Sequence, residues 1–233
     1  KQILITNESY SNFMLAISYF KNYKISNIPE EDKIPILLNI YQIMLIHFKV
    51  NQYLSSIYSQ SSFSNIITYA FNDLTLTNLE IKHVIFRGNK KPPTHFLRLV
   101  YDSDPKANIL PKYSDLRPLF ILHDFEGVDK PKIHIFEKKD LESQLDEIGI
   151  IFLNNYVNND DESIELPQFM KPYMSDFGSE ADFIMFIAKL YNSNKSKPVI
   201  CKIQTDDSRF EIFEKVSLLK KNIQTNKIVI TFK

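Results

Sequence analysis

The sequence predicts an α+β fold: a helix-rich N-terminal half packed on a mixed, mainly antiparallel sheet. Helical periodicity dominates the first part of the chain, helices and strands mix in the middle, and strand patterns close it, an order that fits α+β better than regular βαβ alternation. With 233 residues, 44% of them hydrophobic, the chain can bury roughly 70% of its unfolded surface. We therefore expect one domain over residues 1–233.

The N-terminal part should hold two helices. Apolar residues recur at helical spacing over residues 10–20. A proline followed by acids at 29–32 is typical of a helix N-terminus and predicts a helix over residues 36–53. Apolar side chains surround nearly the whole circumference of this second helix, so we expect it at the centre of the core.

A capping box marks a third helix. In Thr77-Asn78-Leu79-Glu80 the threonine and glutamate can satisfy the first amides of a helix, and Gly88 suits a left-handed C-terminal cap. These signals predict a helix over residues 78–87. On it Glu80, His83 and Arg87 share one face.

The remaining elements alternate in type. We expect a helix at 141–155, a helical turn after Pro167 and an amphipathic helix at 180–191. Strand patterns, either buried or alternating, are found at 117–123, 131–136, 162–166, 199–203, 210–216 and 228–232.

Charge and composition exclude some partner classes. Lys plus Arg and Asp plus Glu both number 28, so no global field favours nucleic acid or anionic lipid, and such a partner would need a local patch. We read the doublets Lys138-Lys139 and Lys220-Lys221 as solvated surface and expect no nucleic-acid partner. The 13% aromatic content can supply a protein interface, with candidates at Tyr19, Phe20 and Tyr23, although core packing explains them as well.

Cysteine use and hydropathy indicate a compartment. Cys201 is the single cysteine, so no intrachain disulfide framework can form and we expect a cytoplasmic protein. Its strand context favours an inert thiol over a nucleophile. The apolar stretch at 34–48 is interrupted by polar residues, so we expect no transmembrane segment. The sequence shows no signal peptide, and because it begins at Lys1 rather than Met we expect a piece of a longer protein.

Several segments, in order, resemble the family called domain of unknown function five-four-seven. The helix with Asn39, Ile40, Tyr41 and His47 resembles the family's Asn-x-Tyr-Asn helix, and residues 81–89 resemble its Ile-Glu-His helix ending in Leu-Arg-Gly-Asn. Residues 104–106, 119–123, 166–173 and 176–178 resemble further family elements. The resemblance covers residues 29–191, with C-terminal strands at 198–233.

The resemblance implies a fold more than a reaction. For the family we expect a cysteine-protease- or transglutaminase-like architecture, found alone or beside glutaredoxin-like or DEP domains. Members usually carry a cysteine-containing strand where this chain reads Leu119 to Asp124, and no cysteine precedes Val199. Any cysteine chemistry of the family is therefore lost here, which predicts a pseudoenzyme.

The candidate site residues have two interpretations. His83, oriented by the Glu80 carboxylate, could act as a general acid or base, or the helix face could merely tie down a loop. Asn39, a polar residue on an apolar helix, is either a site residue or a structural bracket. The resemblance brings Asn39, His83 and Asp124 together as candidate catalytic residues. It adds four candidate binding residues: Glu80, Arg87, Tyr41 and His123.

We predict no metal site and no cofactor. His123, Asp124 and His134 could begin a metal site, but the chain lacks His-Glu-x-x-His and paired Cys-x-x-Cys motifs. Residues 176–178 copy the kinase Asp-Phe-Gly tripeptide without its companion motifs, and we interpret them as a helix stop with a buried phenylalanine. Four glycines in the whole chain leave no phosphate-binding loop.

Two functions follow. The first is a non-catalytic interaction or scaffolding domain of a larger cytosolic protein, with a protein partner. The second is a hydrolase or transferase that uses Asn39, His83 and Asp124. Burial separates them: a solvent-reachable pocket favours an enzyme, and a filled interior favours a scaffold. The sequence does not set the oligomeric state.

Overall fold

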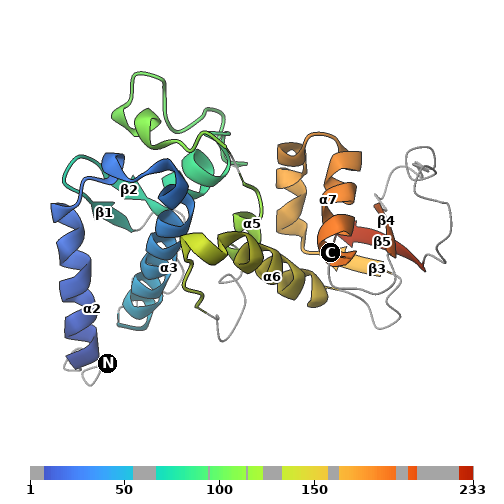
Figure 1. The fold of residues 1–233 in the computed structure, drawn as a ribbon, viewed down its shortest axis with the longest axis horizontal. Coiled ribbons are helices and arrows are strands. Elements are labelled where there is room, and N and C mark those ends of the chain that lie inside the picture. Colours follow the sequence, from blue (N-terminus) through green and yellow to red (C-terminus); the bar gives the residue numbers. More distant parts are fainter. Residues whose placement is uncertain are drawn as a thin grey trace. The chain divides into compact units, whose positions relative to one another are not determined.

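The structure is a computed structural model that describes residues 8–54, 67–93, 95–113, 115–122, 133–156, 163–192, 199–203 and 226–232. It divides into two compact units, an N-terminal unit (Lys1–Leu141) and a C-terminal unit (Glu142–Lys233). Figure 1 shows the helices and strands of both units. The expectation of one domain over the whole chain stays a prediction, and the strand expected at 210–216 lies outside the described residues.

The N-terminal unit is mainly helical, with one two-stranded antiparallel sheet in which Tyr69 pairs with Leu76. The three helices expected in its first ninety residues are confirmed. Its elements are α2 (Glu8–Ser18), η1 (Tyr19–Asn22), η2 (Ile25–Asn27), α3 (Glu30–Leu54), β1 (Thr68–Ala70), β2 (Thr75–Thr77), α4 (Asn78–Glu80), η5 (Ile81–Phe86), η6 (Pro105–Ile109), α5 (Pro118–Leu122) and η7 (Lys138–Asp140).

Helix α3 forms the centre of this unit, as expected. Leu37, Leu38 and Met44 are at most 1% exposed, and α3 contacts η5, which in turn contacts α5. The helix begins at Glu30, six residues earlier than predicted, because the acidic residues 30–32 stabilise its N-terminus from within its first turn. Residues Glu30–Asn51 are long and apolar enough to cross a membrane, but half of that window is buried inside the unit, as in a core helix.

The strand predicted at 117–123 is wrong. Residues Pro118–Leu122 form the short helix α5, and all five are buried. A short apolar run has no periodicity that separates a buried strand from a buried helix. The local chemistry decides for the helix: Pro118 occupies its first position, and the Asp115 carboxylate accepts a hydrogen bond from the Arg117 amide at 2.9 Å.

The half-exposed strand predicted at 131–136 is also wrong for its described residues, 133–136. Residues 133–137 belong to no sheet, and 131–132 lie outside the described residues. The side chains alternate, but Ile133 and Ile135 point outward, 53% and 74% exposed, while Phe136 is buried. The backbone of this segment pairs with side chains of α3 instead of another strand, as the next section shows.

The C-terminal unit combines helices with a three-stranded sheet. Gly149 on α6 brings the helix so close to Leu190 on α7 that a Cβ there would lie 2.5 Å from the leucine Cδ2. The helices predicted here and the strands predicted at 162–166, 199–203 and 228–232 are confirmed. The elements are α6 (Leu141–Asn154, whose first residue belongs to the N-terminal unit), β3 (Ser163–Leu166), η8 (Gln168–Phe177), α7 (Glu180–Asn192), β4 (Val199–Ile203) and β5 (Asn226–Phe232).

The α+β class is confirmed, but the strand direction needs a correction. The larger sheet has the order β3-β5-β4, and both of its pairings are parallel, with Ile164 and Cys201 opposite Ile230 and Ile228. Only the β1–β2 pair in the described residues is antiparallel. Strand direction depends on the connection: η8 and α7 form a long crossover between β3 and β4, which parallel strands require.

Candidate functional site

The helix that carries His83 is fixed at both ends. Thr77 Oγ1 accepts a hydrogen bond from the Glu80 amide at 3.1 Å, and the Thr77 amide donates to Glu80 Oε2 at 2.8 Å, which completes the predicted capping box. Gly88 has a φ of 59°, as predicted for the left-handed cap. The segment Ile81–Phe86 between these caps is a π-helix, a form that the sequence pattern did not predict.

Glu80 does not orient His83. Among the described residues its carboxylate bonds to Thr77 and forms an ion pair with Lys106. Lys106 is held in turn at the start of η6, where Asp104 Oδ1 accepts a hydrogen bond from the Lys106 amide at 2.8 Å. Glu80 therefore links η5 to η6. Sequence reasoning missed Lys106 as its partner, although residues 104–106 were part of the resemblance.

His83 and Arg87 form a buried polar pair. Their exposures are 3% and 4%, and Arg87 Nη1 donates to His83 Nδ1 at 2.6 Å. The same guanidinium nitrogen donates to the Lys91 carbonyl at 3.0 Å. Because arginine stays protonated, His83 Nδ1 must be the acceptor, which fixes the neutral imidazole with its proton on Nε2.

This environment removes His83 as a base near neutral pH. Burial, together with the nearby positive charges of Lys82 and Arg87, lowers the His83 pKa to about 2. A general base at neutral pH needs a pKa near the working pH and a free lone pair. The described geometry gives His83 neither of these.

Asn39 and Gln42 pair with an extended segment. The Asn39 amide donates to the Phe136 carbonyl and accepts from the Phe136 amide, both at 2.9 Å. Gln42 makes the same pair of bonds with His134, at 2.6 and 2.8 Å. The side chains of Asn39 and Gln42 thus form the backbone hydrogen bonds of Phe136 and His134 that a neighbouring strand would form in a sheet. The bracket interpretation of Asn39 is supported, since both of its polar atoms serve the backbone.

Tyr41 holds the end of α5. It is buried, and its hydroxyl donates to the Leu122 carbonyl at 3.4 Å. His123 and Asp124 follow directly, but both lie outside the described residues. The predicted meeting of Asn39, His83 and Asp124 therefore stays a prediction. In the described part of this region, η5 contacts both α3 and α5.

A further histidine lies on α3, in a cluster that the sequence did not single out. His47 Nδ1 lies 3.1 Å from the buried Tyr69 hydroxyl, and the Phe13 ring stands edge-on to the imidazole at 6.0 Å. Burial lowers the His47 pKa and raises the Tyr69 pKa. This cluster joins α2, α3 and β1.

No metal-binding group of three His, Cys, Asp or Glu side chains exists within the residues that the structure describes. The Asp-Phe-Gly tripeptide ends η8, as predicted, with a φ of 103° at Gly178. Phe177 is half-buried rather than buried and packs on Phe183 and Phe186, with ring centroids 5.0 and 4.8 Å away. These residues act in folding.

A sequence model of the family described as "Protein of unknown function, DUF547" matches residues 25–153, more than half of the chain. The chain belongs to the DUF547 family. The DUF547 match runs from η2 into α6, so it includes Asn39, Tyr41, Glu80, His83 and Arg87. No curated protein and no solved structure matches the chain. The protease-like architecture expected for DUF547 therefore stays a prediction.

Proposed function

We propose that this DUF547 domain is a non-catalytic interaction or scaffolding domain of a larger cytosolic protein. The observation that carries the proposal is the state of His83: a buried, neutral imidazole whose Nδ1 accepts a hydrogen bond from Arg87. Such a group contributes to folding and cannot collect a proton from a substrate near neutral pH. The absence of any cysteine before Val199 supports the same conclusion. No cysteine nucleophile is available in the part of the chain that carries His83.

The other candidate groups support this function as well. Both polar atoms of the Asn39 side chain form hydrogen bonds with the Phe136 backbone. The Glu80 carboxylate bonds to Thr77 and forms an ion pair with Lys106. The companions expected for the family, glutaredoxin-like or DEP domains, support its place in a larger protein. A protein partner is part of the proposal.

A ligand survey by thermal shift tests the non-catalytic part. Wild type and His83→Gln are compared with small metabolites, glutathione and divalent metals; glutamine keeps an oxygen that can accept from Arg87. We expect no ligand to raise the melting temperature of either protein, because a degenerate site offers no selective binding. A ligand that stabilises wild type and not His83→Gln would overturn the proposal.

The state of His83 is tested directly by nitrogen-15 NMR of the histidine side chains over a pH series. We expect one imidazole to remain in the neutral form with the proton on Nε2 throughout the range in which ordinary histidines titrate. The signal is assigned by its loss in His83→Gln. A His83 titration near the ordinary value of 6.5 would contradict the proposal.

A further inference from the structure

The loop between η5 and η6 exposes large apolar side chains. Phe96 is 96% exposed, the highest value for a large hydrophobic residue in the described part of the chain, and Leu97 and Tyr101 are 65% and 51% exposed. Single exposed apolar residues are ordinary, whereas a group of them on one loop indicates a binding surface.

The neck of this loop is closed by hydrogen bonds. Asn89 Nδ2 donates to the Val100 carbonyl at 2.7 Å, and the Val100 amide donates to Asn89 Oδ1 at 3.3 Å. Val100 and Pro92 are buried, and the His95 amide donates to the Pro92 carbonyl at 3.0 Å. The base of the loop is therefore part of the folded unit, and its apolar tip projects from a fixed support.

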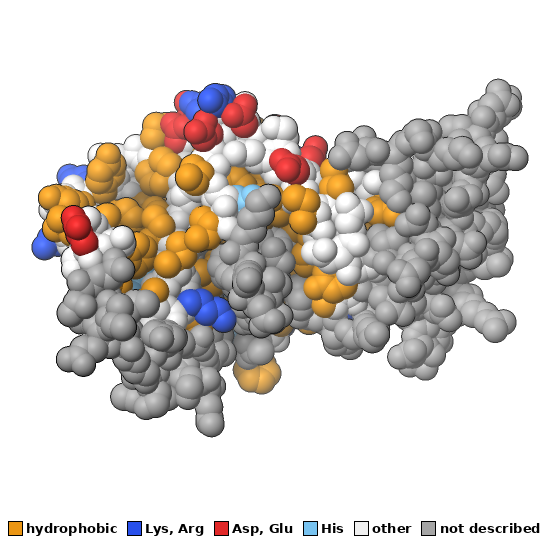
Figure 2. All heavy atoms as spheres, turned by 90° about the horizontal axis from the view of Figure 1, so that it is seen from below, with side chains coloured by type: hydrophobic (Ala, Val, Ile, Leu, Met, Phe, Trp, Pro, Cys, Tyr) orange, Lys and Arg blue, Asp and Glu red, His pale blue; other side chains and the backbone are white. Residues whose placement is uncertain are grey.

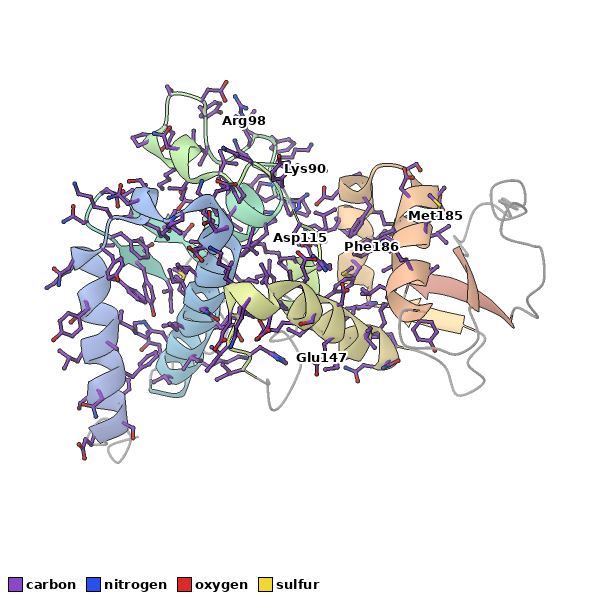
Figure 3. The ribbon with its side chains drawn as sticks, in the orientation of Figure 1. Lys90, Arg98, Asp115, Glu147, Met185 and Phe186 are labelled. Atoms are coloured by element: carbon purple, nitrogen blue, oxygen red, sulfur yellow. The ribbon has the colours of Figure 1, made fainter. Side chains whose placement is uncertain are left out.

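The same loop concentrates positive charge. From residue 88 to 101 the chain has Lys90, Lys91 and Arg98 and no acid, although the whole chain has a net charge of zero. Figure 3 shows Lys90 and Arg98 on this part of the N-terminal unit. Arg98 lies over the Tyr101 ring, 5.5 Å from its centroid, and pairs with Asp102 at 3.3 Å. Lys90 and Lys91 are both exposed.

We propose that this basic–apolar loop (Lys90, Lys91, Phe96, Leu97, Arg98 and Tyr101) docks the N-terminal unit on an anionic membrane surface. Apolar and aromatic side chains at its tip enter the boundary between headgroups and acyl chains, while the lysines meet lipid phosphates. A projecting tip suits a bilayer because the bilayer deforms around it, whereas a protein partner would need a matching pocket. The loop is the local patch that a chain of zero net charge needs for such a partner.

Co-sedimentation with vesicles tests the proposal. Wild type is expected to sediment with vesicles of phosphatidylcholine that contain one-quarter phosphatidylserine, to bind more weakly as salt rises, and to remain in solution with phosphatidylcholine alone. The double variant Lys90→Ala/Lys91→Ala should bind on the order of tenfold more weakly, because each lysine near the surface adds severalfold in affinity. Leu97→Ser should also weaken binding.

The chain offers a matched control for each change. Lys138→Ala/Lys139→Ala removes a lysine doublet outside the loop, where Lys138 and Lys139 lie 3.0 Å from Glu31 and Glu137. Ile135→Ser removes an apolar side chain as exposed as Leu97 but outside the loop. Both controls should bind like wild type, and circular dichroism checks that all variants are folded.

The proposal is overturned if wild type does not bind the anionic vesicles, if it binds both vesicle types equally, or if the Lys138/Lys139 control loses as much affinity as the Lys90/Lys91 variant. It is also overturned if a purified protein partner needs Phe96 while vesicles do not bind. None of these outcomes bears on His83, so the proposed function is tested separately.

Discussion

Two consecutive segments of the chain differ in which side chains they bury and which they expose. In η5 and the residue after it, the polar His83 and Arg87 are buried and bonded to each other, whereas the loop that follows exposes Phe96 and Leu97. Figure 2 views the chain from below and shows hydrophobic side chains gathered on a face of the N-terminal unit other than the side on which Figure 3 draws Lys90 and Arg98. A buried polar pair with satisfied bonds contributes to folding, whereas an exposed apolar tip contributes nothing to the core. His83 and Arg87, two of the candidate site residues, are thus bonded to each other in the core, and the loop after them is the candidate surface.

Of the substitutions that test this difference in burial, Arg87→Ala should reduce stability most. The change leaves the His83 Nδ1 and Lys91 carbonyl acceptors without this donor and opens a cavity. We expect a loss of about 3 kcal/mol in the free energy of unfolding, measured by urea denaturation. Arg98→Ala, at an arginine that is 44% exposed, should cost less than about 1 kcal/mol. Equal losses of unfolding free energy in Arg87→Ala and Arg98→Ala would show that the two segments do not differ in their contribution to stability.

Replacing Asn39 with alanine tests whether another polar side chain with all of its hydrogen bonds formed also contributes to the stability of the unit. The Phe136 amide and carbonyl lose both of their bonds to this side chain, and we expect a loss of about 2 kcal/mol. Asn12→Ala, on an exposed position of α2, is the control and should change stability by less than about 0.5 kcal/mol. If Asn39→Ala is as stable as Asn12→Ala, the hydrogen bonds between Asn39 and Phe136 do not stabilise the unit, and the interpretation of Asn39 as a structural bracket is wrong.

The pH dependence of stability measures the burial of His83. Its folded pKa lies below the unfolded value of 6.5, so the unfolded state binds more protons and stability falls as the pH falls below 6.5. Between pH 6.5 and 5.5 this histidine should cost about 1 kcal/mol. His83→Gln should lack that part of the slope, and urea denaturation at several pH values measures it. His47 shifts stability in the same direction in both proteins, so it cancels. Parallel slopes would mean that His83 titrates normally.

Replacing Phe96 with serine should have the smallest effect. A phenylalanine in a core costs about 3 to 5 kcal/mol when it is truncated, but Phe96 is almost fully exposed. We expect a change below about 0.5 kcal/mol, measured by urea denaturation. Phe86→Ala, at a phenylalanine with no exposed surface, provides the large reference value. A loss above about 2 kcal/mol for Phe96→Ser would show that the loop tip is part of the core.

Local signals in the sequence predicted local structure well. The capping box at Thr77 and Glu80, the left-handed Gly88 and the central helix α3 are all present, because each depends on contacts within one or two turns of chain or on the hydrophobicity of one helix. The family followed from the same kind of pattern, since short motifs in a fixed order survive divergence elsewhere.

Tertiary structure decided which groups meet. The sequence placed Glu80, His83 and Arg87 on one helix face and paired Glu80 with His83, but the Glu80 carboxylate pairs with Lys106, which is distant along the chain, and His83 is left to bond with Arg87. The same limit applies to α5, read as a strand, and to the parallel sheet, because a short buried run and the direction of a strand are set by neighbours and connections. Local pattern thus determined most of the described elements of this protein, whereas contacts between residues distant along the chain decided the form of α5, the direction of the strands and the partner of Glu80.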